Sequence, residues 1–313
     1  MTDKITLSRE IAESIGAAME DDQAARLPFD APLFWFFNGK GGTSKDPRVQ
    51  QELENRQAVH FGGWMVRQSD MIEAMENNGL SFPAGKTWVK HDGYQFQSNS
   101  LEDVYHCRNI LVAPIARRSR WVSSGDDDRT FSAHFDRDKG HTKSHVQMLC
   151  LLFEKTKDGL RLWHPVVLTV KGMQSKKLND ALRTWDTVNK KMREQIAPDV
   201  PPYFFVTPLG TFGDFHDEQA SPGYPSRITP IQTFTGNITE DALRRSFVGE
   251  VAAALMGEYL AKAQDWLGAW EDGGDDTPAA LPETGGHNYN QLHQAAFGKT
   301  EAQGRSHYDE APF

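Results

Sequence analysis

The pattern of hydrophobic and polar residues predicts a series of short strands in the first half of the chain. Leu33–Phe37 is an apolar run too short for a buried helix, and the Asn38-Gly39 that follows is typical of a turn. Further strands are predicted at His60–Val66, Thr87–Gln97, Asn109–Val122, Val146–Lys155 and Leu160–Lys171. The last two flank Thr156-Lys157-Asp158-Gly159, and Asp-Gly between two such runs predicts a β-hairpin.

Helical spacing of apolar residues appears in three other segments. Residues 7–20 predict a short amphipathic helix that Ser8 caps. Residues 174–196 carry one apolar stripe, formed by Leu178, Leu182, Trp185, Val188, Met192 and Ile196. After a second β-rich section from Tyr203 to about Phe234, residues 238–271 predict one long helix capped by Asn237. Its expected buried face consists of Leu243, Phe247, Val251, Leu255, Tyr259, Ala263, Trp266 and Trp270.

Many short strands combined with two main helices predict an α+β, β-rich fold. An oligonucleotide-binding (OB)-like barrel or sheet with added helices fits this order, and so do other β-rich folds. We divide the chain into an N-terminal helical extension at 1–30, a β-rich body at 31–271 and a tail at 272–313. The tail loses hydrophobic periodicity and is rich in small and polar residues, so we expect it to be disordered.

The net charge of −9 is unevenly distributed along the chain. Residues 1–30 contribute −4 and residues 272–313 contribute −5, which leaves the body neutral overall. Within the body, residues 108–177 hold fourteen Lys or Arg against seven Asp or Glu, a local charge of +7. A basic segment between acidic ends is compatible with nucleic-acid binding, and equally with a mixed solvated surface.

Cysteine use and hydropathy indicate the compartment. Cys107 and Cys150 are the only two cysteines, so a disulfide scaffold is not expected and a reducing environment is. No apolar run approaches the about 20 residues that a membrane-spanning helix needs. We therefore predict a cytoplasmic protein without a membrane partner, and leave homo-oligomerisation open.

Aromatic rings are interleaved with the basic residues of the body. Sequence-tolerant binding of a single strand needs cations that follow the phosphates and flat rings on which bases stack. The candidate binding residues are Arg117, Arg118, Arg120, Trp121, Phe131, Phe135, Lys139, His141, Lys143, Trp163 and Lys171, with His134, Lys176 and Lys177 beside them. In the alternative interpretation Trp121 and Trp163 are core rings, and the arginines solvate a strand edge.

The chain ends in two acidic residues, a proline and a C-terminal phenylalanine: Asp309, Glu310, Pro312 and Phe313. This ending resembles the terminal tip of bacterial single-stranded-DNA-binding proteins, and several phage proteins of this kind also end in an acidic tail with an aromatic residue. The resemblance covers only the tip and its linker. It implies that the tip docks into basic-rimmed apolar pockets on replication, recombination and repair proteins, with the ring as anchor and the acids as steering charges.

Two other segments invite comparison with known kinds of site. The loop Gly39–Lys45 resembles the opening of the deviant Walker motif of chromosome-partitioning ATPases, but Ser44 and Asp46 stand where that motif needs a glycine and a hydroxyl. Among the histidines and cysteines only His141 and His145 have a spacing found in metal sites. On a strand these two would lie too far apart for one ion, and no third ligand is evident, so no metal or cofactor is predicted.

We therefore predict a non-catalytic protein that binds and protects single-stranded DNA, serving replication, recombination or repair in a phage or mobile element. A nucleotide hydrolase that uses Gly39–Lys45, and an adaptor that acts only through its tail, are the alternatives.

Overall fold

The computed structural model describes most of the predicted body, namely residues 27–39, 62–83, 88–95, 101–123, 131–132, 134–135, 138, 141–157, 159–198, 200–212, 217–219, 227–236 and 238–270. The helix predicted at 7–20, the expected cap Asn237 and the tail at 272–313 lie outside these residues. Residues 27–30, assigned above to the extension, pack on the body, because the ring of Phe29 lies 4.7 Å from that of Tyr259.

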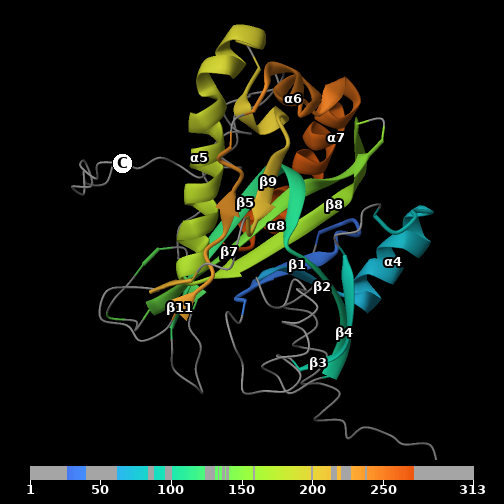
Figure 1. Cartoon of the computed structure of the whole chain (residues 1–313). Coiled ribbons are helices and arrows are strands. Elements are labelled where there is room, and N and C mark those ends of the chain that lie inside the picture. Colours follow the sequence, from blue (N-terminus) through green and yellow to red (C-terminus); the bar gives the residue numbers. More distant parts are fainter. Residues whose placement is uncertain are drawn as a thin grey trace, which may run out of the picture.

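One mixed sheet of ten strands forms the centre of the fold (Figure 1). Nine strands follow in the order β12-β9-β5-β7-β8-β1-β2-β4-β3, and β6 pairs with β5. The strands are β1 (Leu33–Phe37), β2 (Gly63–Arg67), β3 (Val89–Gln95), β4 (Leu101–Cys107), β5 (Asn109–Ser123), β6 (Phe131–Ser132), β7 (His141–Thr156), β8 (Gly159–Lys171), β9 (Thr207–Gly210) and β12 (Gln232–Thr233). A separate pair joins β10 (Glu218–Gln219) to β11 (Arg227–Ile228). The sheet curls into a half-barrel, which confirms the predicted α+β, β-rich class.

The long meander β5-β7-β8 is the part of the sheet that the sequence predicts best. Thr156 of β7 pairs with Gly159 of β8, and the Thr156 hydroxyl donates to the Gly159 carbonyl at 3.0 Å, so the predicted hairpin is confirmed. The run Leu33–Phe37 is a strand as predicted. It inserts between two others, parallel to β8 and antiparallel to β2.

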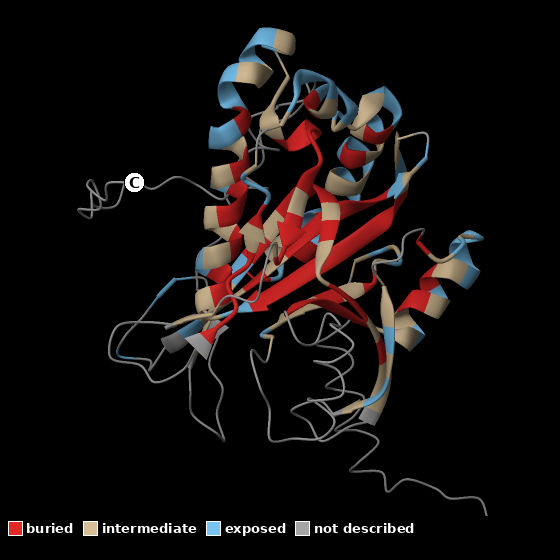
Figure 2. Ribbon diagram, viewed as in Figure 1, coloured by how far each residue is buried: buried red, intermediate tan, exposed pale blue. Residues whose placement is uncertain are grey.

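Helices cover both faces of the meander. Side chains alternate along each strand, so each strand contributes to two layers. The first face, which carries Met148 and Leu168, packs against α5 (Met173–Ile196). The second face, which carries Leu149 and Val167, packs against η1 (Pro202–Phe204), α7 (Gly249–Lys262) and α8 (Gln264–Gly268). Figure 2 shows the strands as the buried layer between helices whose outer surfaces are exposed.

Two elements have too little hydrophobic contrast for the sequence to indicate them. The helix α4 (Gln68–Asn78) buries only Met71 and Ala74 in eleven residues, so its apolar period is weak. The strand β4 is covered on both faces, with Val104 and His106 on one and Cys107 on the other, and therefore lacks the alternation of a half-buried strand. Prediction from the sequence missed both elements.

The single helix predicted at 238–271 is wrong, because the chain forms α6 (Glu240–Arg245), α7 and α8 there. The break after α6 has a backbone cause: Val206 N–H donates to the Ser246 carbonyl at 2.7 Å, and Val248 N–H donates to the Phe204 carbonyl at 2.9 Å. These bonds tie residues 246–248 to residues 204–206 of the same chain and interrupt the helix. Val251, expected in the apolar face, is 78% exposed. The cap of α6 is Thr239, whose hydroxyl accepts from Ala242 N–H at 3.2 Å.

The two halves of the curled sheet meet along a seam, defined here by Trp64, Gly63, Gln174, Leu209 and Gly210. The indole N–H of Trp64 on β2 donates to the carbonyl of Leu209 on β9 at 2.9 Å, although the two strands stand five places apart in the sheet. The buried amide of Gln174 donates to Asn38 and Thr229 and accepts from Ile231 N–H at 3.2 Å. These bonds pair polar groups that burial would otherwise leave unsatisfied.

Glycines allow the close backbone approach at this seam. A Cβ atom on Gly63 would lie 2.2 Å from the Cys107 carbonyl oxygen, and one on Gly210 would lie 2.1 Å from the Arg108 carbonyl oxygen. Both distances are far below van der Waals contact with backbone, which cannot rotate away. The seam therefore requires glycine at both positions.

We predict that Gly63→Ala and Gly257→Ala change stability in opposite directions. Gly63→Ala overpacks the seam and should lower the free energy of unfolding by roughly 1–3 kcal/mol or more. Gly257 lies in α7 and has no atom within 4 Å of the place that a methyl group would take, so alanine there should raise the free energy by about 1 kcal/mol. Denaturant unfolding of the two variants checks this, and equal effects would contradict the close approach at the seam.

Candidate nucleic-acid interface

A row of basic and aromatic side chains crosses the second face of the sheet. Residues paired in register across strands point to the same side. Arg120 pairs with His145, which pairs with Lys171, so β5, β7 and β8 each place a nitrogen-bearing side chain there. Two residues along, Thr169 pairs with Trp35 of β1, and Trp35 pairs with Met65 of β2. We call this set the second-face row: Arg118, Arg120, Lys143, His145, Lys171, Trp35, Phe37, Arg67, His106 and His91.

The β5 end of the row is a stack of cations and indole rings. The guanidinium of Arg118 lies 4.1 Å from the Trp266 ring centroid and 4.2 Å from that of Trp270. It donates to Gln147 at 2.9 and 2.6 Å and to the Trp266 carbonyl at 2.6 Å, and only 7% of Arg118 is exposed. The guanidinium of Arg120 also lies over the Trp270 ring, 4.3 Å from its centroid. Arg118 therefore fixes α8 to the sheet, and Arg120 continues the stack toward the open side.

The charge at this end is positive. His145 shares a hydrogen bond with the Thr169 hydroxyl at 3.0 Å, and its ring lies 5.0 Å from that of Trp270. Burial, followed by the charges of Lys171, Arg120 and Arg118, lowers the pKa of His145 to about 3. Burial also lowers the pKa of Arg120. His145 is thus neutral at pH 7 and surrounded by cations, which is an environment that attracts an anion such as phosphate.

The opposite end of the row is aromatic. The Arg67 guanidinium lies 5.2 Å from the Trp35 centroid and pairs with Glu102 at 2.7 Å. The rings of Phe37 and His91 each lie 6.0 Å from that of His106. His106 is buried, and burial lowers its pKa to about 4, with His91 contributing in the same direction. Trp35, Phe37 and His91 are partly exposed, so the row offers flat rings at one end and cations at the other.

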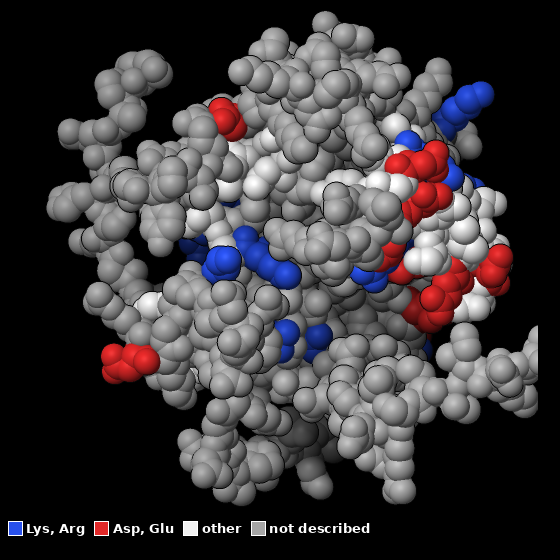
Figure 3. Space-filling view, turned by 90° about the horizontal axis from the view of Figure 1, so that it is seen from below, with Lys and Arg blue, Asp and Glu red and all other residues white. Residues whose placement is uncertain are grey.

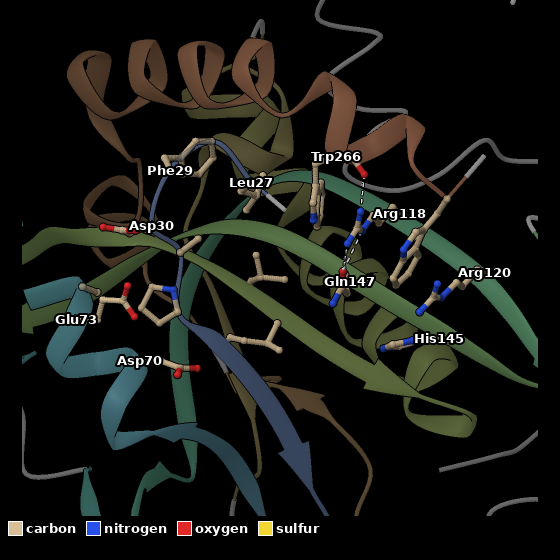
Figure 4. A pocket seen from close by; sticks show the side chains of 16 residues that line it. Leu27, Phe29, Asp30, Asp70, Glu73, Arg118, Arg120, His145, Gln147 and Trp266 are labelled. Atoms are coloured by element: carbon tan, nitrogen blue, oxygen red, sulfur yellow. Dashed lines mark hydrogen bonds between the residues drawn. The ribbon is translucent and has the colours of Figure 1, made fainter. Parts of the chain in front are cut away.

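A cavity of about 610 Å³ lies on the second face beside the cationic end (Figure 4). Arg118, Arg120 and His145 line one side of it, and Val167 and Leu33 of the sheet contribute apolar lining. Figure 3, which views the molecule from below, shows several Lys and Arg side chains near the centre of the view and most of the Asp and Glu side chains toward one side.

The structure brings four of the predicted binding residues together on the second face: Arg118, Arg120, Lys143 and Lys171. Arg117 points to the other face, where it donates to Asn179 of α5 at 2.8 Å. Trp121 also alternates away from the row, and its ring packs on that of Phe135 at 4.8 Å. Phe135 itself is 54% exposed. The run of basic residues in β5 is therefore divided between two surfaces.

Trp163 belongs to the hydrophobic core. It is 5% exposed, its indole N–H donates to the Ser81 carbonyl at 2.8 Å, and it packs with the first-face residues. It cannot stack on a base in this structure, which corrects its place among the candidates. Lys176 and Lys177 start α5 on the first face, and Lys177 pairs with Glu218. The side chains of Phe131 and His141, and all of Lys139, lie outside the described residues.

The aromatic half of the row and the rings of the stack have little signal in the sequence and are not predicted from it. Trp35 and Phe37 lie in a continuous apolar run, where no alternation distinguishes one face from the other. Trp266 and Trp270 are expected only on the apolar face of a helix, with no indication of what they contact. The signal for them is the cluster of two tryptophans in five residues near the end of the folded body.

The loop Gly39–Lys45 is described only at its first residue. Gly39 N–H donates to the Thr229 hydroxyl at 3.0 Å, at the edge of the seam, and residues 40–45 lie outside the described part of the chain. Among the described residues there is no group of three or more His, Cys, Asp or Glu side chains placed to hold a metal ion. Cys107 and Cys150 are both buried free thiols.

Comparisons with models of protein families, with curated proteins and with solved structures find no match. In the described part of the chain, every helix is too short or too polar to cross a membrane.

We predict that acid destabilises the protein through its buried histidines. The pKa values of His145 and His106 are about 3 and about 4 in the folded chain, against an ordinary value of 6.5. Below pH 6.5 the unfolded chain therefore binds protons at these residues and the folded chain does not, so the free energy of unfolding falls as the pH falls. The loss should be on the order of 1 kcal/mol per histidine between pH 6.5 and 5.5.

Denaturant unfolding over this pH range measures the effect, with His145→Gln as the test variant and His134→Gln, at an exposed position, as control. The slope of stability against pH should become shallower in His145→Gln and stay unchanged in His134→Gln. An unchanged slope in His145→Gln would show that this ring protonates freely in the folded chain.

Proposed function

We propose that this protein binds single-stranded DNA along the second-face row and acts without catalysing a reaction. The observation that carries the proposal is the register of the sheet, which aligns Arg120, Lys171 and Trp35 on one face. Cations at the β5 end suit phosphates, and partly exposed rings at the β1 end suit bases, which is the combination that sequence-tolerant strand binding requires. The row favours single strands over duplex, since stacking on rings requires unpaired bases.

The curled half-barrel is compatible with an OB-like architecture. In that architecture the bound nucleic acid runs across the β-strands of the sheet rather than along one of them. The row is oriented in this way, because it runs from β5 over β7, β8, β1, β2 and β4 to β3. We propose that the rings of Trp121 and Phe135 at the far end of β5 make an accessory contact. The two buried thiols suit a reducing cytoplasm.

The C-terminal tip supports the second half of the proposal. Asp309, Glu310, Pro312 and Phe313 resemble the tip through which bacterial single-stranded-DNA-binding proteins recruit replication, recombination and repair proteins. In this chain the body would hold the strand, while the tail would reach the partner. A phage or mobile element is the setting that we propose for both activities.

We predict salt-sensitive binding to single strands, weaker binding to duplex, and separable losses in two variants. Trp35→Ala removes a stacking platform worth roughly 1–3 kcal/mol, or about 5- to 150-fold in affinity. Lys171→Ala removes one phosphate contact and should reduce the slope of log affinity against log salt by about 0.7. Fluorescence anisotropy with an oligothymidylate at several salt concentrations measures both quantities.

Two exposed residues on other surfaces provide matched controls. Phe247→Ala removes a ring that is 39% exposed beside α7, and Lys190→Ala removes an exposed charge on α5. Both should leave the affinity and the salt slope unchanged. If duplex binds as tightly as the single strand, or if the control variants lose as much affinity as Trp35→Ala, the proposed interface is wrong.

We predict that deletion of 309–313 abolishes the capture of partner proteins and leaves strand affinity equal or tighter. The deletion removes an aromatic anchor and two acids that compete with phosphate for basic side chains. Phe313→Ala should break partner capture alone, because it keeps Asp309 and Glu310. Pull-down with intact and truncated protein, beside a strand titration of each, measures the two effects. Capture of the same partners by the truncated protein would refute the role of the tip.

A further inference from the structure

The second-face cavity has ends of opposite charge. Its cationic end is formed by Arg118, Arg120 and His145. At the other end, α4 contributes the carboxylates of Asp70 and Glu73, and Figure 4 shows the two groups of side chains on opposite sides of an apolar middle. A simple phosphate-binding pocket would not place carboxylates on its wall, so the ligand must satisfy both ends.

The two carboxylates at the acidic end can accept hydrogen bonds from a ligand. Asp70 accepts from the Ser69 hydroxyl at 3.2 Å, and burial raises its pKa, so its site lacks full solvation. Glu73 is exposed, and among the described residues it has no hydrogen-bond or ion-pair partner. Asp30 also lines the cavity, but its carboxylate accepts from the Asn77 amide at 2.8 Å and points away from the arginines (Figure 4).

The length of the cavity suits one nucleotide. It extends over four adjacent strands, β5, β7, β8 and β1, before it reaches α4. Strands are spaced by about 4.8 Å, so β1 lies about 14 Å from β5. Arginine side chains extend inward from one end and carboxylates from the other, which leaves room for a single base, sugar and phosphate. The apolar middle, with Val167 and Leu33 beneath and Phe29 and Trp266 at the sides, suits a base and sugar.

The charges favour guanine over thymine. A phosphate bound at the cationic end directs the base toward α4. The carboxylates there accept hydrogen bonds and cannot donate them, so they favour hydrogen-bond donors on the edge of the base. Guanine presents adjacent N1–H and N2–H donors on its Watson–Crick edge, and a single carboxylate can accept both. Thymine presents one N–H between two carbonyl oxygens, which a carboxylate repels.

We propose that the second-face cavity binds one nucleotide of the strand and prefers guanine, with its phosphate at Arg120 and its base edge at Asp70 and Glu73. This inference rests on the proposed function, since it identifies a base-selective position within an otherwise sequence-tolerant interface. The cavity lies next to the second-face row, so a strand that crosses the row can place one nucleotide in it.

The test compares the full chain with a double variant, Asp70→Asn and Glu73→Gln, and with Glu76→Gln as matched control. Glu76 is an exposed carboxylate on the same helix and does not line the cavity. The probes are an oligothymidylate, the same oligonucleotide with one central guanine, and the free nucleotides dGMP and dTMP. Anisotropy measures the oligonucleotides, and NMR shifts of the His145 ring measure the free nucleotides. Unchanged thermal unfolding verifies that each variant is folded.

The wild type and Glu76→Gln should bind the guanine-containing oligonucleotide about tenfold more tightly than oligothymidylate. The double variant should bind the two oligonucleotides equally, and should bind oligothymidylate at least as tightly as the wild type does because two negative charges are lost. Only dGMP should shift the His145 resonances at low concentration.

The failures of the two proposals are distinguishable. Equal affinity of the wild type for both oligonucleotides, together with equal shifts from dGMP and dTMP, overturns the guanine preference and leaves strand binding intact. Absence of binding to either oligonucleotide overturns the proposed function. If dGMP alone still binds in that case and the double variant abolishes it, the cavity is a nucleotide site on a protein that does not bind strands. A preference for guanine that persists in the double variant also refutes the role of α4.

Discussion

The hydrogen bond between the Trp64 indole and the Leu209 carbonyl joins strands that stand five places apart in one sheet. An open sheet of this size would stay twisted and separate at its ends. Here the first face curls onto itself around Trp64, and glycines at 63 and 210 let the backbones meet. The first face is thereby filled by the core and α5. The second face, beyond the area covered by α7 and α8, carries the charged and partly exposed aromatic side chains of the second-face row. The location of the candidate interface follows from that closure.

The sequence predicts those elements of the fold that are determined by residues close together in the chain. The Asp-Gly dipeptide and the long apolar runs are local signals, and the β7–β8 hairpin and the strands β5, β7 and β8 appear as expected. The site depended on information that no local pattern contains. Arg117, Arg118 and Arg120 look like one cluster in the sequence, yet alternation along β5 places Arg117 on the face opposite the other two. Trp266 and Trp270 follow Arg118 by about 150 residues in the sequence, yet their rings contact its guanidinium. Trp35 acquires its neighbours only because β1 inserts beside β8, a pairing with no sequence signature.

Arginine serves two different purposes within a few ångströms on this face. Arg118 lies against two indoles and is hydrogen-bonded to Gln147, so its desolvation is offset by cation–π contacts and charge-assisted bonds. Its role is structural, because it joins α8 to β5. Arg120 lies two residues further along the strand and shares the Trp270 ring. Because Arg118 holds that ring in place, Arg120 is oriented before any ligand arrives, which lowers the entropy lost on binding.

The parallel pairing of β1 with β8 has a consequence for how the chain folds. Leu33 pairs with Val167, so closing this contact encloses more than a hundred residues, whereas β5, β7 and β8 join through near neighbours. Long-range closures carry the larger entropic cost and are typically late events. We expect the meander to form first and to present an unpaired β8 edge until β1 arrives. During synthesis β1 leaves the ribosome well before β8 does, so one edge of this apolar strand stays unpaired until β8 has emerged, although its other edge can already pair with β2.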